Sequence, residues 1–207
     1  MIKDFFDLKL YEKETELCQI MNSCGSDKGS GHHNYTKFYD FIFKDIKSET
    51  KYVFELGLGT NNLSIPSNMS GLGTPGGSLR GWSNYFTNAK IFGADIDRDI
   101  LDNINTFYCD QTNASSVKEL CNNFDFKFDV VIEDGLHTFE ANKIFLENFI
   151  DVVKDGGIFI IEDIDIIYFN EFNKYILLNK DKYKFMELVV IPNEKNKSDN
   201  NVIFIIK

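Results

Sequence analysis

Two short apolar runs in this sequence each end at acidic residues. Positions 130–137 read VVIEDGLH, and positions 160–163 read IIED. A continuous Val/Ile run is typical of a strand in a parallel sheet, because such a strand is buried on both faces. Open α/β sheets bind ligands at the carboxyl ends of their strands. The acids therefore predict a site at that edge of a parallel sheet, with His137 three residues beyond Asp134.

The length and composition fit one α/β domain with a small appendage. The chain has 207 residues, of which 43% are hydrophobic and 14% aromatic, enough for a substantial core. Its net charge of -10 opposes binding to nucleic-acid phosphates and to anionic membranes. Glu162, Asp163 and Asp165 interrupt the best candidate for a membrane span. The amino-terminal residues lack a signal-peptide pattern, and the four cysteines lack C-x-x-C pairing. We expect a cytoplasmic protein with reduced thiols.

The spacing of apolar residues predicts the order of helices and strands. Residues 1–50 show helical spacing around Leu17, Ile20 and Met21 and again from Tyr35 to Phe43, which predicts amino-terminal helices. Beyond residue 50, apolar runs alternate with helical stretches, as in βαβ units. We expect strands at 51–57, 90–95, 104–109, 128–133 and 157–162, and helices at 79–87, 98–102, 114–123, 138–153 and 168–179. Gly156 and Gly157 should end the helix before the fifth of these strands.

The carboxyl-terminal stretch has a different pattern. The apolar runs 184–191 and 201–206 are joined by a polar loop with no room for a helix, so they should pair antiparallel. The prediction is an α/β fold with a Rossmann-like, mostly parallel seven-stranded sheet and a carboxyl-terminal antiparallel hairpin. We expect an amino-terminal helical cap at 1–50 and the main domain at 51–207.

Acids and glycines also follow the first three predicted strands. Glu55 precedes a turn that holds Gly57 and Gly59, where a ligand could approach the backbone without meeting a Cβ. Asp95 ends the second strand and suits ribose hydroxyls, and Asp110 ends the third, where it could accept from an adenine amino group. A bare tight turn, helix caps or solvated turn residues are the alternatives for each motif taken alone.

Together these motifs resemble the class I S-adenosylmethionine-dependent methyltransferases over roughly residues 51–207. The resemblance rests on E-x-G-x-G at 55–59, the acids after the second and third strands, and the terminal hairpin. It implies S-adenosylmethionine as cofactor, with its methionine part near the glycines, its ribose on Asp95 and its adenine facing Asp110. The expected cofactor-binding residues are Glu55, Gly57, Gly59, Ser78, Leu79, Asp95, Asp97, Asp110 and Gln111.

Further motifs are similar to the metal-dependent sugar O-methyltransferases of macrolide tailoring. These are PGGSLRGW at 75–82, D-G-x-H at 134–137 and I-E-D at 161–163. S-D-K-G at 26–29 and H-N-Y-T at 33–36 are similar to relatives in glycan and capsule biosynthesis. The resemblance implies a magnesium ion on Asp134, Glu162 and Asp163. It also implies that His137, with Asp134 beside it, deprotonates the acceptor hydroxyl.

Spacing alone leaves the details of this second site open. It does not decide which of Glu133, Glu162 and Asp163 bind the metal. A helix-entry role for His137, and capping or loop solvation for Glu162 and Asp163, are the structural alternatives. The chemistry favours the catalytic interpretation, because a hard cation on carboxylates lowers the pKa of a bound hydroxyl and a neutral histidine can take its proton.

The predicted function is magnesium-assisted methyl transfer to a hydroxyl of a small polar, sugar-containing acceptor. The alternatives are a metal-independent methyltransferase, a nucleotide-dependent oxidoreductase and a non-catalytic cofactor-binding module. The oxidoreductase is disfavoured because Asn62 stands where a dinucleotide fingerprint has its third glycine,. We expect no nucleic-acid or membrane partner. The amino-terminal helices could pack on the sheet or on a second subunit, so a homo-oligomer stays open.

Two loops attract attention by their composition. Residues 61–79 are rich in Gly, Ser, Asn and Pro and are too long for an ordinary βα connection, which predicts a lid or a substrate-facing loop. His32 and His33 lie in a polar, glycine-bearing segment with no third metal ligand nearby in the sequence. That segment is either a solvated loop or one that closes over the cofactor or acceptor.

Overall fold

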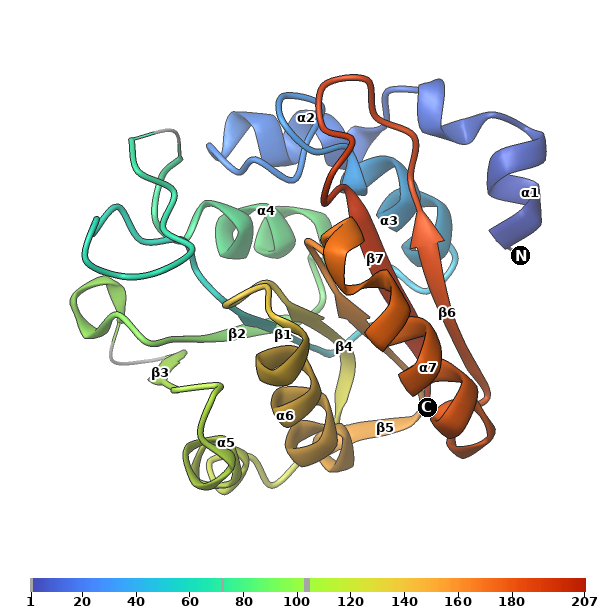
Figure 1. The fold of residues 1–207 in the computed structure, drawn as a ribbon. Helices are drawn as coiled ribbons and strands as arrows, with labels where there is room; N and C mark the ends of the chain where they lie inside the picture. Colours follow the sequence, from blue (N-terminus) through green and yellow to red (C-terminus); the bar gives the residue numbers. More distant parts are fainter. Residues whose placement is uncertain (1, 72, 103–104) are drawn as a thin grey trace.

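The computed structural model describes residues 2–71, 73–102 and 105–207. A seven-stranded sheet with the order β3-β2-β1-β4-β5-β7-β6 runs through the molecule (Figure 1). The strands β1 to β5 are parallel, and β7 pairs antiparallel with both β5 and β6. The α/β fold with a carboxyl-terminal hairpin is therefore confirmed. The strands are β1 (Tyr52–Leu56), β2 (Lys90–Asp95), β3 (Thr106–Tyr108), β4 (Phe128–Glu133), β5 (Val153–Ile161), β6 (Phe185–Val190) and β7 (Asn201–Ile206).

Helices cover both faces of the sheet and bury a separate hydrophobic cluster on each (Figure 1). One face carries α1 (Ile2–Asp7), α2 (Glu16–Ser23), α3 (Tyr35–Phe43) and α4 (Gly77–Tyr85); the other carries α5 (Ala114–Cys121), α6 (Phe139–Phe149) and α7 (Phe169–Asn179). Val130 and Ile132 of β4 point into the first cluster and Val131 into the second. Side chains alternate between the two faces of a strand, so a strand covered on both sides is apolar throughout.

Short 3-10 turns join several of these elements. They are η1 (Leu10–Glu12), η2 (Arg98–Ile100), η3 (Ile150–Val152), η4 (Ile166–Tyr168) and η5 (Lys180–Lys182). The helix expected at 98–102 is thus only the turn η2. The strand expected at 104–109 is shorter, and residue 104 lies outside the described residues.

Gly156 and Gly157 lie inside β5, so the prediction that they end a helix is wrong. The preceding helix α6 ends at Phe149, η3 follows it, and β5 begins at Val153. The register between β4 and β5 shifts after the Phe128–Val153 pair. Gly156, at φ +82°, forms part of this bulge, and its N–H donates to the Lys207 carbonyl at 2.9 Å. A glycine in a strand often marks such a bulge.

The amino-terminal helices share the first cluster with the sheet. Phe38 of α3 packs edge-on against Phe204 of β7, with ring centroids 5.7 Å apart, and Tyr39 packs against Trp82 of α4 at 5.8 Å. Trp82 is fully buried. The division at residue 50 into a cap and a main domain stays a prediction. None of the helices in the described part of the chain has the length and apolar character that a membrane span needs.

Candidate functional site

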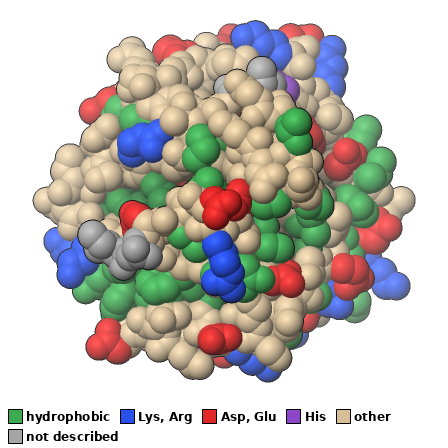
Figure 2. All heavy atoms as spheres, turned by 90° about the vertical axis from the view of Figure 1, so that its left-hand side faces the viewer, with side chains coloured by type: hydrophobic (Ala, Val, Ile, Leu, Met, Phe, Trp, Pro, Cys, Tyr) green, Lys and Arg blue, Asp and Glu red, His purple; other side chains and the backbone are tan. Residues whose placement is uncertain are grey.

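A cavity of about 940 Å³ opens at the carboxyl ends of the parallel strands. It lies between these strand ends, the segment before α3 and the long loop after β1. On the face drawn in Figure 2, lysine and arginine side chains are scattered among acidic and hydrophobic ones. Six of the residues expected to bind the cofactor line the cavity: Gly57, Gly59, Ser78, Asp95, Asp110 and Gln111.

The turn after β1 is held by the acid that ends β2. Gly57 has φ +83°, and a Cβ there would lie 1.8 Å from the carbonyl oxygen of Asp134. Asp95 accepts hydrogen bonds from the backbone N–H of Leu58 at 2.7 Å and of Asp97 at 2.8 Å. The Asp95 carboxylate therefore organises two turns at once, and each of its oxygens keeps a lone pair for a ligand.

Three residues expected to bind the cofactor do not line the cavity. Asp97 accepts hydrogen bonds from the Thr60 hydroxyl and the Asp99 N–H, so it joins the β1 turn to η2. Leu79 packs on the core. Glu55 is fully buried beneath the cavity. These three side chains support the structure around the cavity but do not face the cavity itself.

Glu133, which spacing left open as a metal ligand, is engaged elsewhere. Its carboxylate accepts from Gln111 Nε2 at 3.0 Å, from Asn142 Nδ2, and from the Gly135 N–H at 3.1 Å. Gln111 in turn accepts from the Leu136 N–H at 2.7 Å. Glu133 is fully buried, and burial raises its pKa to about 7. This network holds the turn that carries Asp134 and His137.

Asp134, His137 and Asp163 converge at the cavity wall. His137 Nε2 lies 3.1 Å from Asp134 Oδ1 and 3.4 Å from Asp163 Oδ2. His137 and Asp163 both have positive φ, 57° and 52°, an uncommon conformation that clusters at functional sites. Burial alone would lower the pKa of His137, but the carboxylates of Asp163 and Asp134 outweigh it and raise that pKa to about 10.

The two carboxylates beside His137 fit a divalent ion. One ligand atom from each carboxylate and one from His137 lie within 4.8 Å of one another. Carboxylate oxygens are the donors that magnesium and calcium prefer. The two acids sit at the ends of neighbouring strands, β4 and β5, because a parallel pairing brings successive carboxyl ends to one edge.

Glu162, the remaining predicted ligand, is buried and faces Lys28. The Lys28 ammonium contacts Glu162 Oε2 and Asp134 Oδ2, and lies 3.2 Å from Glu55 Oε1. Burial alone would lower the pKa of Lys28, but these three carboxylates hold it well above its usual value. Asp134 has its own pKa held below the ordinary value, because Lys28 and His137 outweigh the effect of burial.

Two tyrosines of α3 support the acids that follow β5. The Tyr39 hydroxyl donates to Glu162 Oε1, and the Tyr35 hydroxyl lies 2.6 Å from Asp163 Oδ1. Sequence reasoning placed both tyrosines on an amphipathic helix and gave Lys28 no role. The S-D-K-G motif was the available signal for Lys28, but only the packed structure shows what its side chain contacts.

The two loops singled out by composition both reach the cavity. Residues 65–70 line it, and the Met69 N–H donates to the Thr60 carbonyl at 2.8 Å; residue 72 lies outside the described residues. His33 is buried, stacks on Tyr35 with centroids 4.7 Å apart, and places Nδ1 3.6 Å from Asp163 Oδ1. His32 is exposed but also lines the cavity.

Sequence comparison finds relatives among curated O-methyltransferases. The chain is 32% identical over 163 residues to demethylmacrocin O-methyltransferase of Streptomyces fradiae, covering 76% of this chain and 38% of that enzyme. It is 30% identical over 162 residues to a tetracenomycin-C 3'-O-methyltransferase of Streptomyces olivaceus, with coverage of 74% and 38%. It is 28% identical over 166 residues to mycinamicin VI 2''-O-methyltransferase of Micromonospora griseorubida, with coverage of 77% and 39%. No known family profile matches the chain.

Solved structures confirm the fold. The MycE methyltransferase of mycinamycin biosynthesis, solved with Mg and SAH, aligns over 94% of this chain and 55% of its own, with a TM-score of 0.72 and 22% identity. At that identity the likeness shows the fold, that of a class I methyltransferase. The chain spans less than two fifths of the length of the curated relatives just described, at 38% and 39%.

Proposed function

We propose that this chain, which has the class I methyltransferase fold and resembles the sugar O-methyltransferases in sequence, transfers a methyl group from S-adenosylmethionine to an acceptor hydroxyl. The acceptor is a small, polar, sugar-containing molecule, and a magnesium ion assists the reaction. The observation that carries the proposal is the meeting of Asp134, His137 and Asp163 in the cavity that also exposes the Gly57 turn.

The cofactor lies along the ends of β1, β2 and β3 in this proposal. The glycines leave room for its methionine part, and Asp95 accepts hydrogen bonds from its ribose. Asp110 and Gln111 lie at the third strand end, in reach of an adenine. Glu55, Leu79 and Asp97 act indirectly here, because they support the turns from outside the cavity.

His137 is the proposed general base, and the two acids beside it set its charge state when no metal is bound. Asp134 and Asp163 raise its pKa to about 10, so it is protonated at neutral pH and cannot accept another proton. Asp134 and Asp163 would hold the divalent ion, and a neutral His137 would accept the proton of the hydroxyl at Nε2. Magnesium, when bound, supplies a Lewis acid that lowers the pKa of that hydroxyl.

The acceptor side of the cavity favours an uncharged, hydroxyl-bearing ligand. Its wall includes Ser26, Ser67, Asn68 and Thr74, which are neutral donors and acceptors. The tetracenomycin-C relative is named for a substrate that bears a rhamnosyl group, which supports a sugar-containing acceptor. The cytoplasmic location, the lack of nucleic-acid or membrane partners and the oligomeric state stay predictions from the sequence.

Calorimetric titration tests cofactor and metal together. S-adenosylmethionine is titrated into the full chain with magnesium and again with excess EDTA, and NAD serves as the control ligand. Binding of S-adenosylmethionine without heat from NAD is expected. No binding of S-adenosylmethionine in either condition would sink the proposal.

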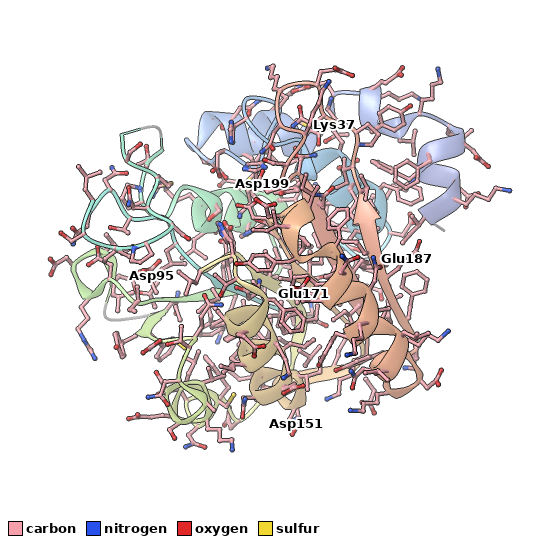
Figure 3. All side chains as sticks on the ribbon, in the orientation of Figure 1. Lys37, Asp95, Asp151, Glu171, Glu187 and Asp199 are labelled. Atoms are coloured by element: carbon pink, nitrogen blue, oxygen red, sulfur yellow. The ribbon has the colours of Figure 1, made fainter. Side chains whose placement is uncertain are left out.

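Methyl transfer is then followed by mass spectrometry with a panel of glycosylated acceptors. Asp134→Asn and His137→Asn should each lower the rate by about a hundredfold or more; asparagine tolerates the positive φ of position 137. The matched control is Asp151→Asn, because Asp151 lies at the far end of α6 from Asp95 and the cavity (Figure 3). Transfer that survives EDTA would favour the metal-independent alternative.

A further inference from the structure

Lys28 is a buried lysine that reaches the acidic cluster from outside the parallel sheet. It belongs to the turn between α2 and α3, and its side chain is 2% exposed. Its ammonium meets Glu55, Asp134 and Glu162, which come from the ends of β1, β4 and β5. Those three strands are neighbours at the centre of the sheet.

The ammonium uses oxygen atoms that a metal ion would need. It contacts Glu162 Oε2, while Tyr39 takes Glu162 Oε1. It also contacts Asp134 Oδ2, which leaves Asp134 Oδ1 to face His137. Asp134 and Glu162, two of the three acids that the resemblance implies as metal ligands, are therefore already paired with a cation of this chain.

An ammonium and a divalent ion cannot both sit against the same carboxylate oxygens, because like charges in direct contact repel strongly. Buried carboxylates also need a positive partner, because an unpaired buried charge is costly. The cluster thus suits either cation but disfavours both at once.

The turn that carries Lys28 is able to respond to such an exchange. Residues 25–28 line the cavity, so a Lys28 side chain that left the acids would enter the cavity. Local backbone contacts anchor the turn: the Lys28 N–H donates to Ser26 Oγ at 3.3 Å, and its carbonyl accepts from the Thr36 N–H at 3.2 Å. These contacts hold the main chain at Lys28 and do not involve its side chain.

We propose that Lys28 is a tethered cation that competes with the divalent ion for Asp134 and Glu162, so that metal binding withdraws its ammonium from the cluster. Lys28 keeps the acids paired when no metal is bound and weakens the affinity of the site for metal. Because residues 25–28 line the cavity, withdrawal of the Lys28 ammonium on metal binding also changes the cavity wall. This inference rests on the metal site of the proposed function.

Amine labelling reports the position of Lys28 directly. The full chain is acetylated with an N-hydroxysuccinimide ester in EDTA or in saturating magnesium, and each lysine is quantified by peptide mass spectrometry. Lys28 should label about tenfold faster or more with magnesium, because it leaves a buried position. Exposed Lys13 is the internal reference and should label equally in both. If Lys28 stays protected from labelling while calorimetry shows that magnesium is bound, metal binding does not withdraw the ammonium and the proposal is wrong.

Removal of the lysine gives the second readout. Lys28→Met should bind manganese, followed by electron paramagnetic resonance, about tenfold tighter or more than the native chain, because a competing positive charge is gone. Lys13→Met should leave the affinity unchanged. Equal or weaker binding by Lys28→Met contradicts the proposal.

The variant could also unfold in EDTA, because three buried acids lose their partner. In that case the proposal expects magnesium to restore its circular dichroism spectrum, and a failure to refold contradicts it. If the native chain binds S-adenosylmethionine but no divalent ion, the metal part of the proposed function falls and takes this inference with it. If it binds the ion but not S-adenosylmethionine, the methyltransferase proposal falls alone.

Discussion

At Gly57 the backbone of the site leaves no room for a side chain. A Cβ would lie 1.8 Å from the Asp134 carbonyl oxygen, and φ is +83°. Both the neighbouring strand end and the backbone conformation therefore require glycine. The turn at Gly57 and the turn that carries Asp134 are thus packed directly on each other.

Gly57→Ala should destabilise the chain by roughly 3 kcal/mol or more and weaken S-adenosylmethionine binding. Urea denaturation and calorimetry measure the two effects. Gly71→Ala is the matched control, because an added Cβ at Gly71 meets nothing within 4 Å and Gly71 does not line the cavity. Native stability and affinity in Gly57→Ala would show that the turn can relax, contrary to this packing.

Cys109 at the tip of β3 gives a pH-dependent probe of the cavity. It lines the cavity but is only 2% exposed, and burial raises the pKa of its thiol to about 12. The reactive thiolate is therefore scarce at neutral pH. Alkylation of Cys109 by iodoacetamide should rise about tenfold per pH unit from pH 7 to 10 without a plateau. A plateau near pH 9 in the native chain, read by peptide mass spectrometry, would contradict the raised pKa.

At the scale of elements, the start of α3 is hydrogen-bonded to the loop that connects β6 and β7. The Asn34 N–H donates to Asn200 Oδ1 at 3.3 Å, and Asn200 Nδ2 donates to Asn34 Oδ1 at 2.7 Å. Tyr35 follows directly, and its hydroxyl lies 2.9 Å from the Asp199 carbonyl (Figure 3 labels Asp199). The hairpin therefore positions the helix whose tyrosines reach the acids.

Asn200→Ala should lower the free energy of unfolding by about 1–3 kcal/mol, because Asn34 loses a buried partner. It should also slow methyl transfer, because Tyr35 loses part of its support. Denaturation and the mass-spectrometric assay measure these effects. Asn170→Ala, at an exposed position of α7, should change neither. A variant with native stability but slow methyl transfer would show that Asn200 acts by positioning Tyr35 and not by stabilising the fold.

At the scale of the whole molecule, the cavity lies where separate parts of the chain meet. The ends of the parallel strands form its floor, and the segment before α3 and the loop after β1 form its walls. A ligand that fills the cavity contacts all of them in the native state and none of them together in the unfolded chain. Its binding should therefore stabilise the fold as a unit.

SAH at about 100 times its Kd should add about 2.7 kcal/mol of stability and raise Tm by roughly 5 to 11 °C in a chain of this size. Differential scanning fluorimetry measures the shift. Asp95→Asn should reduce it relative to its own ligand-free baseline, and Asp151→Asn should preserve it. An undiminished shift in Asp95→Asn would remove the ribose role from that residue.

Local patterns in the sequence determined the order of elements and the edge where the site lies. Strands buried on both faces had to be apolar throughout, so the runs before Asp134 and Glu162 were recognisable without coordinates. The polar loop between 184–191 and 201–206 likewise predicted the hairpin. Gly156 misled the prediction, because a glycine signals a helix end and a strand bulge alike.

Tertiary structure alone decided which side chains meet at that edge. Lys28 contacts acids 106 and 134 positions away in the chain. Tyr35 and Tyr39 come from α3, which packs on the sheet face of the first hydrophobic cluster. Glu55 and Glu162 point beneath the cavity and not into it. The spacing of apolar residues shows which face of a helix or strand is buried. Only the packing of helices on the sheet determines which side chains, distant in sequence, come into contact there. The pairing of the acids with Lys28 therefore had no local signature in the sequence.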